Sequence, residues 1–269
     1  MKLKQLAACS LLALGLGASV EAQAHRAWML PSATVLSGEN AWITVDGAVS
    51  NSLFYFEHHP LRLDNLEIIS PSGKQIEAQN QATGKYRSVF DVELAEEGTY
   101  ILQNRNQGIF GRYRLNGEMK RWRGTVDEIS EIPEEAEDLR LMEIDSRMQV
   151  FVTKGAPTDS TFKTSGQGIE LIPVTHPNDL FTGEPVSFRF LVDGEPGAEL
   201  EVTLIRDGIR YRDQVEEITL KTDTRGQVEL TFDQPGMYWL EVEAEQDSTQ
   251  LEGAKRRLSY SATLEVLPL

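Results

Sequence analysis

The sequence of 269 residues has one cysteine, few basic residues and no long apolar run. A lone Cys9 can form no internal disulfide and provides no thiolate cage for a metal. The 26 Lys and Arg residues are outnumbered by 42 Asp and Glu, and the formal net charge is −16. Such a surface repels phosphate backbones, so we expect no nucleic-acid partner. A membrane helix needs ~20 apolar residues, so we expect no membrane insertion of the processed chain.

Motifs of common enzymes are also missing. The sequence contains no Gly-x-Ser-x-Gly, no Walker loop, no His-Glu-x-x-His and, once residues 1–24 are removed, no cysteine nucleophile. Pairs of carboxylates are too frequent in so acidic a chain to indicate glycosidase acids. We therefore expect a protein that is not an enzyme.

Residues 1–24 have the composition of a secretory signal peptide. Lys2 and Lys4 precede the apolar run "LAACSLLALGLGA", and Ala22-Gln23-Ala24 provides small residues at a cleavage site. Cleavage after Ala24 would remove Cys9 and make His25 the first residue. The sequence thus predicts a periplasmic protein secreted through a cleaved signal peptide.

The remaining chain consists of short alternating segments rich in Val, Ile, Thr and aromatic residues, separated by Gly, Pro, Asp and Asn. This pattern is typical of an all-β protein with antiparallel sandwiches. An internal similarity divides it in two: "LSGENAWITVDG" (36–47) resembles "FTGEPVSFRFLVDG" (181–194), and "EEGTYIL" (96–102) resembles "QPGMYWL" (234–240). We expect Tyr100 and Tyr238 to be structural residues that bond nearby backbone.

Two tandem immunoglobulin-like domains are the simplest arrangement of these halves. The first would span 25–154 and the second 169–269, joined by a linker at 155–168 that is rich in Gly, Ser, Thr and Pro. The first domain carries an insertion at about 104–145. Its basic aromatic beginning predicts a hairpin or a flap, and its acidic end has weak helical spacing broken at Pro133. A solvated acidic loop is the alternative for these glutamates.

Histidines are the candidate metal ligands. Cleavage would give His25 two nitrogen donors, its α-amine and its imidazole, which is half of a histidine brace. "FEHHPLRLD" adds His58 and His59, and "VTHPND" adds His176 before a second proline. Imidazole nitrogen suits Ni, Co, Cu and Zn. The sequence predicts a transition-metal site formed by His25, His58, His59 and His176 if the fold brings them together.

The leader that ends before "AHRAWMLPS", together with "GIELIPVTHPNDLFTGEPVSFRFLVDGEPGAELEVTLI" and "KTDTRGQVELTFDQPGMYWLEVEA", resembles a bacterial exported family of unknown function. That family is grouped with periplasmic components of nickel and cobalt uptake, the NikM-like proteins. The resemblance implies a metal-binding or accessory protein that serves an uptake transporter or receptor. Of the histidines, only His25 matches the opening of the family, as does Trp28.

Two alternatives remain open. The first is a copper enzyme that uses a histidine brace at His25, for which Trp28, Trp122 and Tyr113 could form an aromatic platform. The second is a metal-free β-sandwich module that binds a protein or glycan partner in the cell envelope, which scattered histidines would favour.

Overall fold

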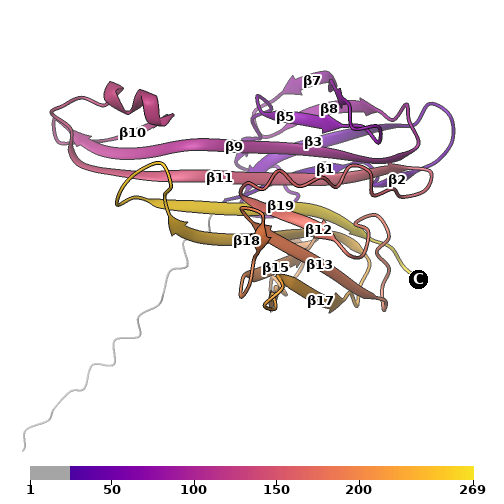
Figure 1. Cartoon of the computed structure of the whole chain (residues 1–269). Helices are drawn as coiled ribbons and strands as arrows, with labels where there is room; N and C mark the ends of the chain where they lie inside the picture. Colours follow the sequence, from indigo (N-terminus) through magenta and orange to yellow (C-terminus); the bar gives the residue numbers. More distant parts are fainter. Residues whose placement is uncertain (1–24) are drawn as a thin grey trace, which may run out of the picture.

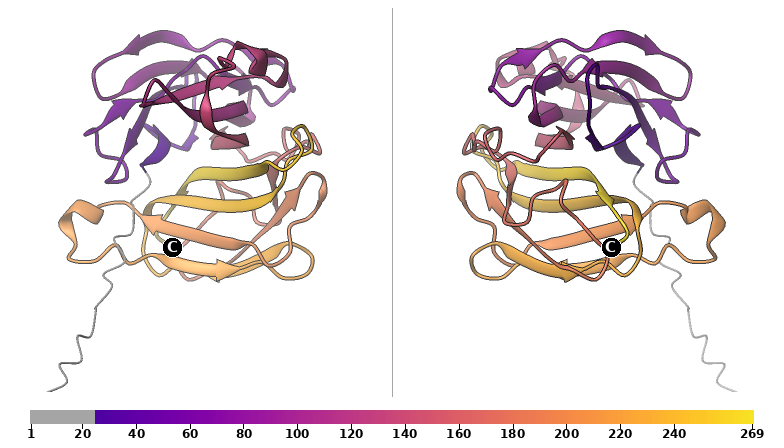
Figure 2. Two further views of the ribbon diagram at one scale, coloured as in Figure 1. Left: turned by 90° about the vertical axis from the view of Figure 1, so that its left-hand side faces the viewer. Right: turned by 90° about the vertical axis from the view of Figure 1, so that its right-hand side faces the viewer.

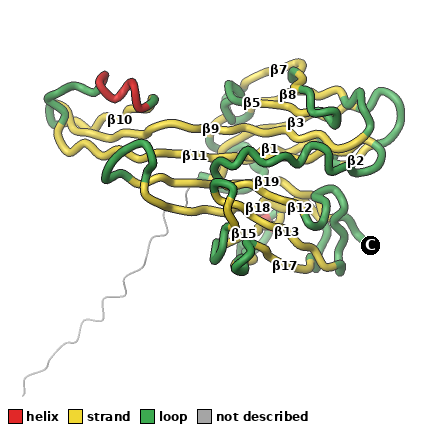
Figure 3. The backbone as a smooth tube through the Cα atoms, viewed as in Figure 1, coloured by secondary structure: helices red, strands yellow, loops and turns green. Residues whose placement is uncertain are grey.

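The computed structural model describes residues 25–269, so the predicted signal peptide lies outside the described residues. The all-β prediction is confirmed, with 55% of residues in strands and 4% in helices. Strands make up most of the described chain outside its loops (Figure 3), and most strand pairs are antiparallel. Between His25 and Leu269, no helix is both long and apolar enough to cross a membrane.

The strands form three sheets. The first sheet contains β1 (Arg26–Pro31), β3 (Trp42–Ser50), β4 (His59–Pro60), β7 (Gln79–Thr83) and β8 (Ser88–Glu93). The central sheet contains β2 (Val35–Leu36), β5 (Leu66–Ile69), β6 (Gln75–Ile76), β9 (Gly98–Leu115), β10 (Glu118–Gly124), β11 (Glu137–Lys154), β15 (Glu201–Arg206), β16 (Ile218–Lys221), β18 (Gly236–Asp247) and β19 (Lys255–Val266). The third sheet contains β12 (Ile169–Pro173), β13 (Pro185–Val192), β14 (Glu195–Pro196) and β17 (Gln227–Thr231). Two short 3-10 helices, η1 (Val126–Glu131) and η2 (Ile209–Tyr211), lie between strands.

The central sheet runs through both halves of the chain. β11 pairs with β9 on one side and, in parallel, with β19 on the other. The first sheet covers the β9 and β11 region from one side, and the third sheet covers β18 and β19 from the opposite side (Figures 1 and 2). The two halves therefore share one sheet, and the expected division at 155–168 into tandem domains stays a prediction.

Alternation along the central strands supplies two cores. Val150 and Val152 of β11 pack in the core under the first sheet, whereas Phe151 between them packs in the core under the third sheet. A third cluster joins the halves, because Trp28 of β1 packs with Trp239 of β18 and Ile205 of β15. Burial on both faces of the shared sheet holds the halves together as one body.

The two predicted tyrosine corners are confirmed. The Tyr100 hydroxyl donates to the carbonyl of Glu96 at 3.0 Å, and the Tyr238 hydroxyl donates to the carbonyl of Gln234 at 2.8 Å. Each bond spans the same four-residue interval within the repeated Gly-x-Tyr segment. These tyrosines thus close equivalent turns in the two halves.

The insertion extends the two strands that carry it. β9 and β11 are 18 residues each, roughly 60 Å, and they stay paired beyond the body of the molecule as an arm (Figure 1). The hairpin alternative is observed: β9 turns into β10 through Asn116 and Gly117, whose φ values of 53° and 82° suit a type I′ turn. Helical spacing in the acidic part yields only η1.

Candidate functional site

The end of β3 brings three of the four histidines together. β1 pairs along one edge of β3, with Arg26 opposite Ser50, and β4 pairs along its other edge, with His59 opposite Val49. His25 therefore lies at one side of this end and His59 at the other. His58 stacks between them, with ring centroids 3.8 Å from His25 and 4.8 Å from His59. All three side chains are exposed.

A neighbouring amide orients His25. Nδ1 of His25 lies 2.6 Å from Oδ1 of Asn51. Because that oxygen only accepts, Nδ1 carries the hydrogen and Nε2 is left as the basic nitrogen. An imidazole that donates its other N–H in this way is typical of metal ligands. A chelate through the α-amine needs Nδ1 instead, so this orientation favours coordination through Nε2 over the predicted brace.

Crowding affects the charge of the cluster. Although His58 is exposed, partial desolvation of its ring and the charges of the neighbouring His25 and His59 lower its pKa, while Glu57 opposes the effect. The neutral imidazole is the form that binds metals. Across residues 25–269, however, no three His, Cys, Asp or Glu side chains already converge as a metal site. Binding would require the exposed rings to turn so that their nitrogens face one ion.

The structure does not bring His176 to this cluster. Its Nε2 lies 3.0 Å from Oγ1 of Thr99, and its Nδ1 accepts the backbone N–H of Asn178 at 3.0 Å. Thr99 is five residues from Asn104 on β9, roughly 17 Å, and Asn104 lines the same pocket as His25. Burial lowers the pKa of His176. Both ring nitrogens thus serve a structural network that ties the segment after the linker to β9.

A pocket of about 330 Å³ adjoins the cluster. His25 and Ala27 line one side, and the central sheet forms the floor. The strand register places two rows of side chains across this floor. One row is Asn104, Met148, Ser261 and Glu241, and the next is Asn106, Ser146, Ser259 and Glu243. The floor is therefore polar, with small serines at its centre and carboxylates along β18.

Glu241 is the most perturbed acid of this pocket. Burial raises its pKa from 4.5 to about 7, and the nearby Glu243 adds to the rise against the opposing charges of Arg26 and Arg257. Glu243 itself is paired with Arg257. Perturbed acids of this kind concentrate at functional sites. The pocket thus holds an acid that changes charge near neutral pH, close to the histidines.

One family model matches residues 22–246, and its description is a domain of unknown function, DUF4198. The chain belongs to this family. No curated protein matches it. The family description carries no link to nickel or cobalt uptake, so the predicted NikM-like relationship is not shown.

Solved structures resemble this DUF4198 protein only distantly. A DUF4785 family protein from Legionella pneumophila has 10% identity, a TM-score of 0.25 and coverage of 80% of this chain, which spans half of that protein. The D0-D1 domain of intimin has 10% identity and a TM-score of 0.22, with 88% of this chain and 97% of that chain covered. The human OSCAR ligand-binding domain has 13% identity and a TM-score of 0.20, with 90% and 99% covered. The sandwich architecture above rests on this protein's own strand pairing.

The aromatic platform expected of a copper enzyme is not assembled at His25. Trp28 is fully buried and donates from Nε1 to Oγ of Ser50 at 2.9 Å. Trp122 and Tyr113 lie on β10 and β9 in the arm. Trp28 therefore lies in a different part of the molecule from Trp122 and Tyr113.

Glu241 escaped the sequence analysis. The alternation of "YWLEVEAE" predicts that the glutamates of this segment face water, as polar residues do on the solvated face of an antiparallel sheet. In the structure the start of β1 approaches β11 and β19 over that face and encloses part of it. The sequence of β18 alone cannot predict that β1, which lies about 200 residues earlier in the chain, covers part of this face.

Proposed function

We propose that this DUF4198 protein is an exported, periplasmic protein that binds a transition metal ion, of the nickel, cobalt, copper or zinc type, as part of metal uptake. His25 and His58 are the proposed primary ligands, with His59 as a third. The observation that supports the proposal is that the fold gathers three of the four histidines, from two separate segments, at the end of β3. His176, whose nitrogens are both engaged, is left out of the ligand set.

The donor set agrees with this metal class. Imidazole nitrogens bind borderline metals at about 2.0–2.1 Å, and the cluster contains no sulfur. Arg26, the cation next to His25, lies 3.7 Å from a carboxylate oxygen of Glu217 and over the ring of Trp239. Its charge is thus partly neutralised, which lessens its repulsion of a metal ion at His25. We propose binding rather than catalysis, because Trp28, Trp122 and Tyr113 do not gather at His25 as a copper enzyme of the predicted kind would require.

Metal titration tests the proposal. We would measure binding of Ni, Co, Cu and Zn by calorimetry to the chain beginning at His25 and to its His25→Ala, His58→Ala and His59→Ala variants. Loss of a primary ligand should weaken binding at least tenfold. His59→Ala should have a smaller effect, because its ring lies farther from that of His25. A form with one additional residue before His25 tests whether the α-amine takes part.

The controls use exposed positions, so folding should be unaffected, and circular dichroism would verify it. Asn51→Ala is the matched variant for orientation: it leaves every imidazole in place and should reduce affinity by a smaller factor. Equal, weak binding by all proteins would refute the metal site. Retained tight binding in the form with the additional residue would show coordination through imidazoles alone.

A further inference from the structure

Arginines line up across three neighbouring strands of the arm. The register places Arg112 of β9 directly between Arg121 of β10 and Arg140 of β11. These three form what we call the arginine ladder. The adjacent row on the same face consists of Arg123, Phe110, Met142 and Lys255. Like charges opposite one another destabilise a sheet, so the ladder gains stability from an anion laid across it.

The ladder has no acidic partner within residues 25–269. Nearby arginines on these strands do find carboxylates, as Arg105 pairs with Asp145 and Arg114 with Asp138. No ion pair or side-chain hydrogen bond includes a ladder arginine or Arg123 in the part of the chain that the structure describes. In a protein of net charge −16, this row of unpaired guanidinium groups makes the surface charge locally positive.

A groove of about 950 Å³ runs beside the ladder, between the arm and the turn that joins β18 to β19. Arg112, Arg123 and Arg140 line it together with Lys255 and Arg257, and Glu252 is its one acidic lining residue in the described chain. Its apolar lining residues are Phe110, Leu139, Leu141, Met142, Ile144, Leu251 and Ala254. Leu139 is 42% exposed. Cationic and apolar residues therefore line the same space.

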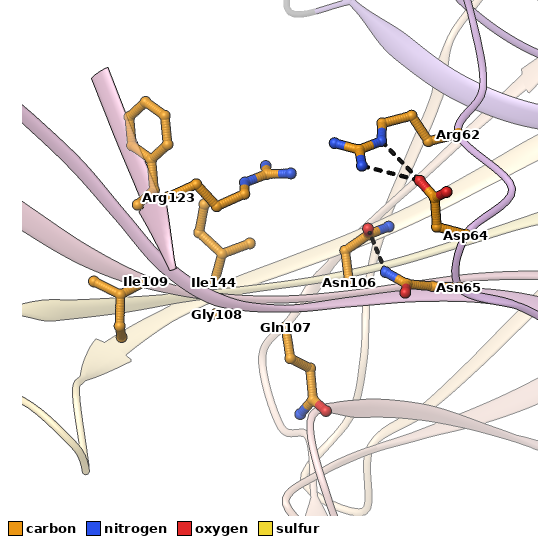
Figure 4. A pocket seen from close by; sticks show the side chains of 10 residues that line it. Arg62, Asp64, Asn65, Asn106, Gln107, Gly108, Ile109, Arg123 and Ile144 are labelled. Carbon is orange, nitrogen blue, oxygen red and sulfur yellow. Dashed lines mark hydrogen bonds and ion pairs between the residues drawn. The ribbon is translucent and has the colours of Figure 1, made fainter. Parts of the chain in front are cut away.

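The groove continues inward to a smaller pocket of about 160 Å³ that shares Phe110, Arg123 and Ile144 with it. Figure 4 shows Arg123 extending over this pocket, opposite the pair formed by Arg62 and Asp64. A hydrogen bond of 3.0 Å from Asn65 to Asn106 lies at the same end. The inner end is thus polar, and the apolar surface lies toward the arm.

We propose that this groove binds an anionic phospholipid, with the phosphate on the arginines and the first acyl carbons on the apolar wall, so that the arm attaches the protein to an anionic membrane surface. Guanidinium groups bind phosphate oxygens in pairs of parallel hydrogen bonds. An acidic protein segment would use the charges but leave the apolar wall unpartnered. This favours an amphiphile over an acidic peptide.

The arm geometry also makes such attachment compatible with an acidic body. Arg112 lies six residues along β9 from Asn106 on the pocket floor, roughly 20 Å. The Debye length at physiological salt is about 8 Å, so repulsion between the acidic body and an anionic surface is largely screened at this distance. The projection of the arm in Figure 1 lets it reach a surface before the body does.

Vesicle flotation tests the proposal with residues 25–269. We would compare vesicles of phosphatidylcholine alone with vesicles of phosphatidylcholine and phosphatidylglycerol in equal parts. We expect binding only to the anionic vesicles, weakening as salt is added. Basic residues near an anionic surface contribute additively, so R112Q/R121Q/R140Q should lower the partition coefficient about a hundredfold. The matched control R210Q/K221Q/R225Q removes the same charge from exposed sites outside the arm and should bind as the wild type does.

A second variant separates the lipid from simple charge attraction. Leu139→Ser keeps every charge and changes an exposed side chain, and it should still weaken binding several-fold. Binding that is equal in the ladder variant and the wild type would overturn the proposal. A ladder-dependent interaction with poly-glutamate, without vesicle binding, would likewise overturn it in favour of an acidic protein partner. Metal titration of the same proteins is independent of these outcomes, since no histidine lies in the groove.

Discussion

Replacing Glu241 by Gln should stabilise the protein, and the gain should grow with pH. The folded carboxyl has a pKa of about 7 against 4.5 for its ordinary value. As pH rises from 4.5 toward 7, the unfolded chain releases this proton before the folded protein does. The unfolded state then binds fewer protons, so the free energy of unfolding of the wild type decreases over this window. Glutamine carries no proton to lose and avoids that decrease.

The size of the effect follows from the same pKa difference. A rise of about 2.5 corresponds to about 3 kcal/mol, which we reduce to about 2–3 kcal/mol because Glu241 is only half-buried. For a protein of this length, the variant should melt roughly 5–10 °C above the wild type at pH 8 and nearly together with it at pH 4.

Thermal unfolding followed by circular dichroism between pH 4 and 8 measures this difference. Glu245→Gln is the control: it removes the same charge from an exposed position four residues along the same face of β18. A gain for Glu241→Gln that is independent of pH, or equal in Glu245→Gln, would refute the argument that burial holds this carboxyl neutral.

Three further changes test the packing of the shared sheet. Arg256→Met leaves the buried carboxylate of Glu143 without its cation and takes one of two arginines from Asp145, which keeps Arg105. It should cost about 3–5 kcal/mol in urea unfolding, whereas the exposed Arg225→Met should cost about 1 kcal/mol or less. Tyr238→Phe removes the bond to Gln234 and should cost about 1–2 kcal/mol by the same assay; no loss would contradict its role in the turn. Because burial lowers the pKa of His176, the wild type should lose stability as pH falls below 6.5, and His176→Gln should lose less over that range in a pH series of melts.

Local patterns predicted much of this fold. Gly-x-Tyr marked the corners at Tyr100 and Tyr238, and Asn116-Gly117 supplies the residues that a tight hairpin requires. Each of these turns is formed by a few neighbouring residues, so a short segment of sequence is enough to predict it. Alternation likewise predicted strands, because it reports burial on one face.

Pairing between the halves was not predicted. Met142 of β11 lies beside Lys255 of β19, and nothing local links the two segments. Residues 147–153 are all buried in succession, as in a strand covered on both faces. The sequence shows this only as the apolar residues Met148, Val150, Phe151 and Val152, which do not alternate strictly with polar ones. The polar residues Arg147 and Gln149 interrupt this apolar run. They can be buried because Arg147 bonds to Glu170 and Gln149 bonds to Gln103.

For the candidate site, sequence reasoning supplied the histidines but not their grouping. His58 and His59 lie near His25 because β1 and β4 pair with opposite edges of β3 at the same end of that strand. This strand pairing cannot be read from the sequence around the histidines. His176 shares the His-Pro pair with His59, yet a buried network of threonines and Asn178 occupies its nitrogens. Identical dipeptides thus reach different environments.

The position of β19 in the central sheet has a consequence for how the chain matures. β19 leaves the ribosome long after β11, yet β11 depends on it for its second edge. Until it arrives, β11 presents a long unpaired edge, which is the kind of surface on which chains pair wrongly. We therefore expect chains truncated before Lys255 to aggregate as a whole rather than to release a folded first half, so that folding of the first half waits for the synthesis of β19.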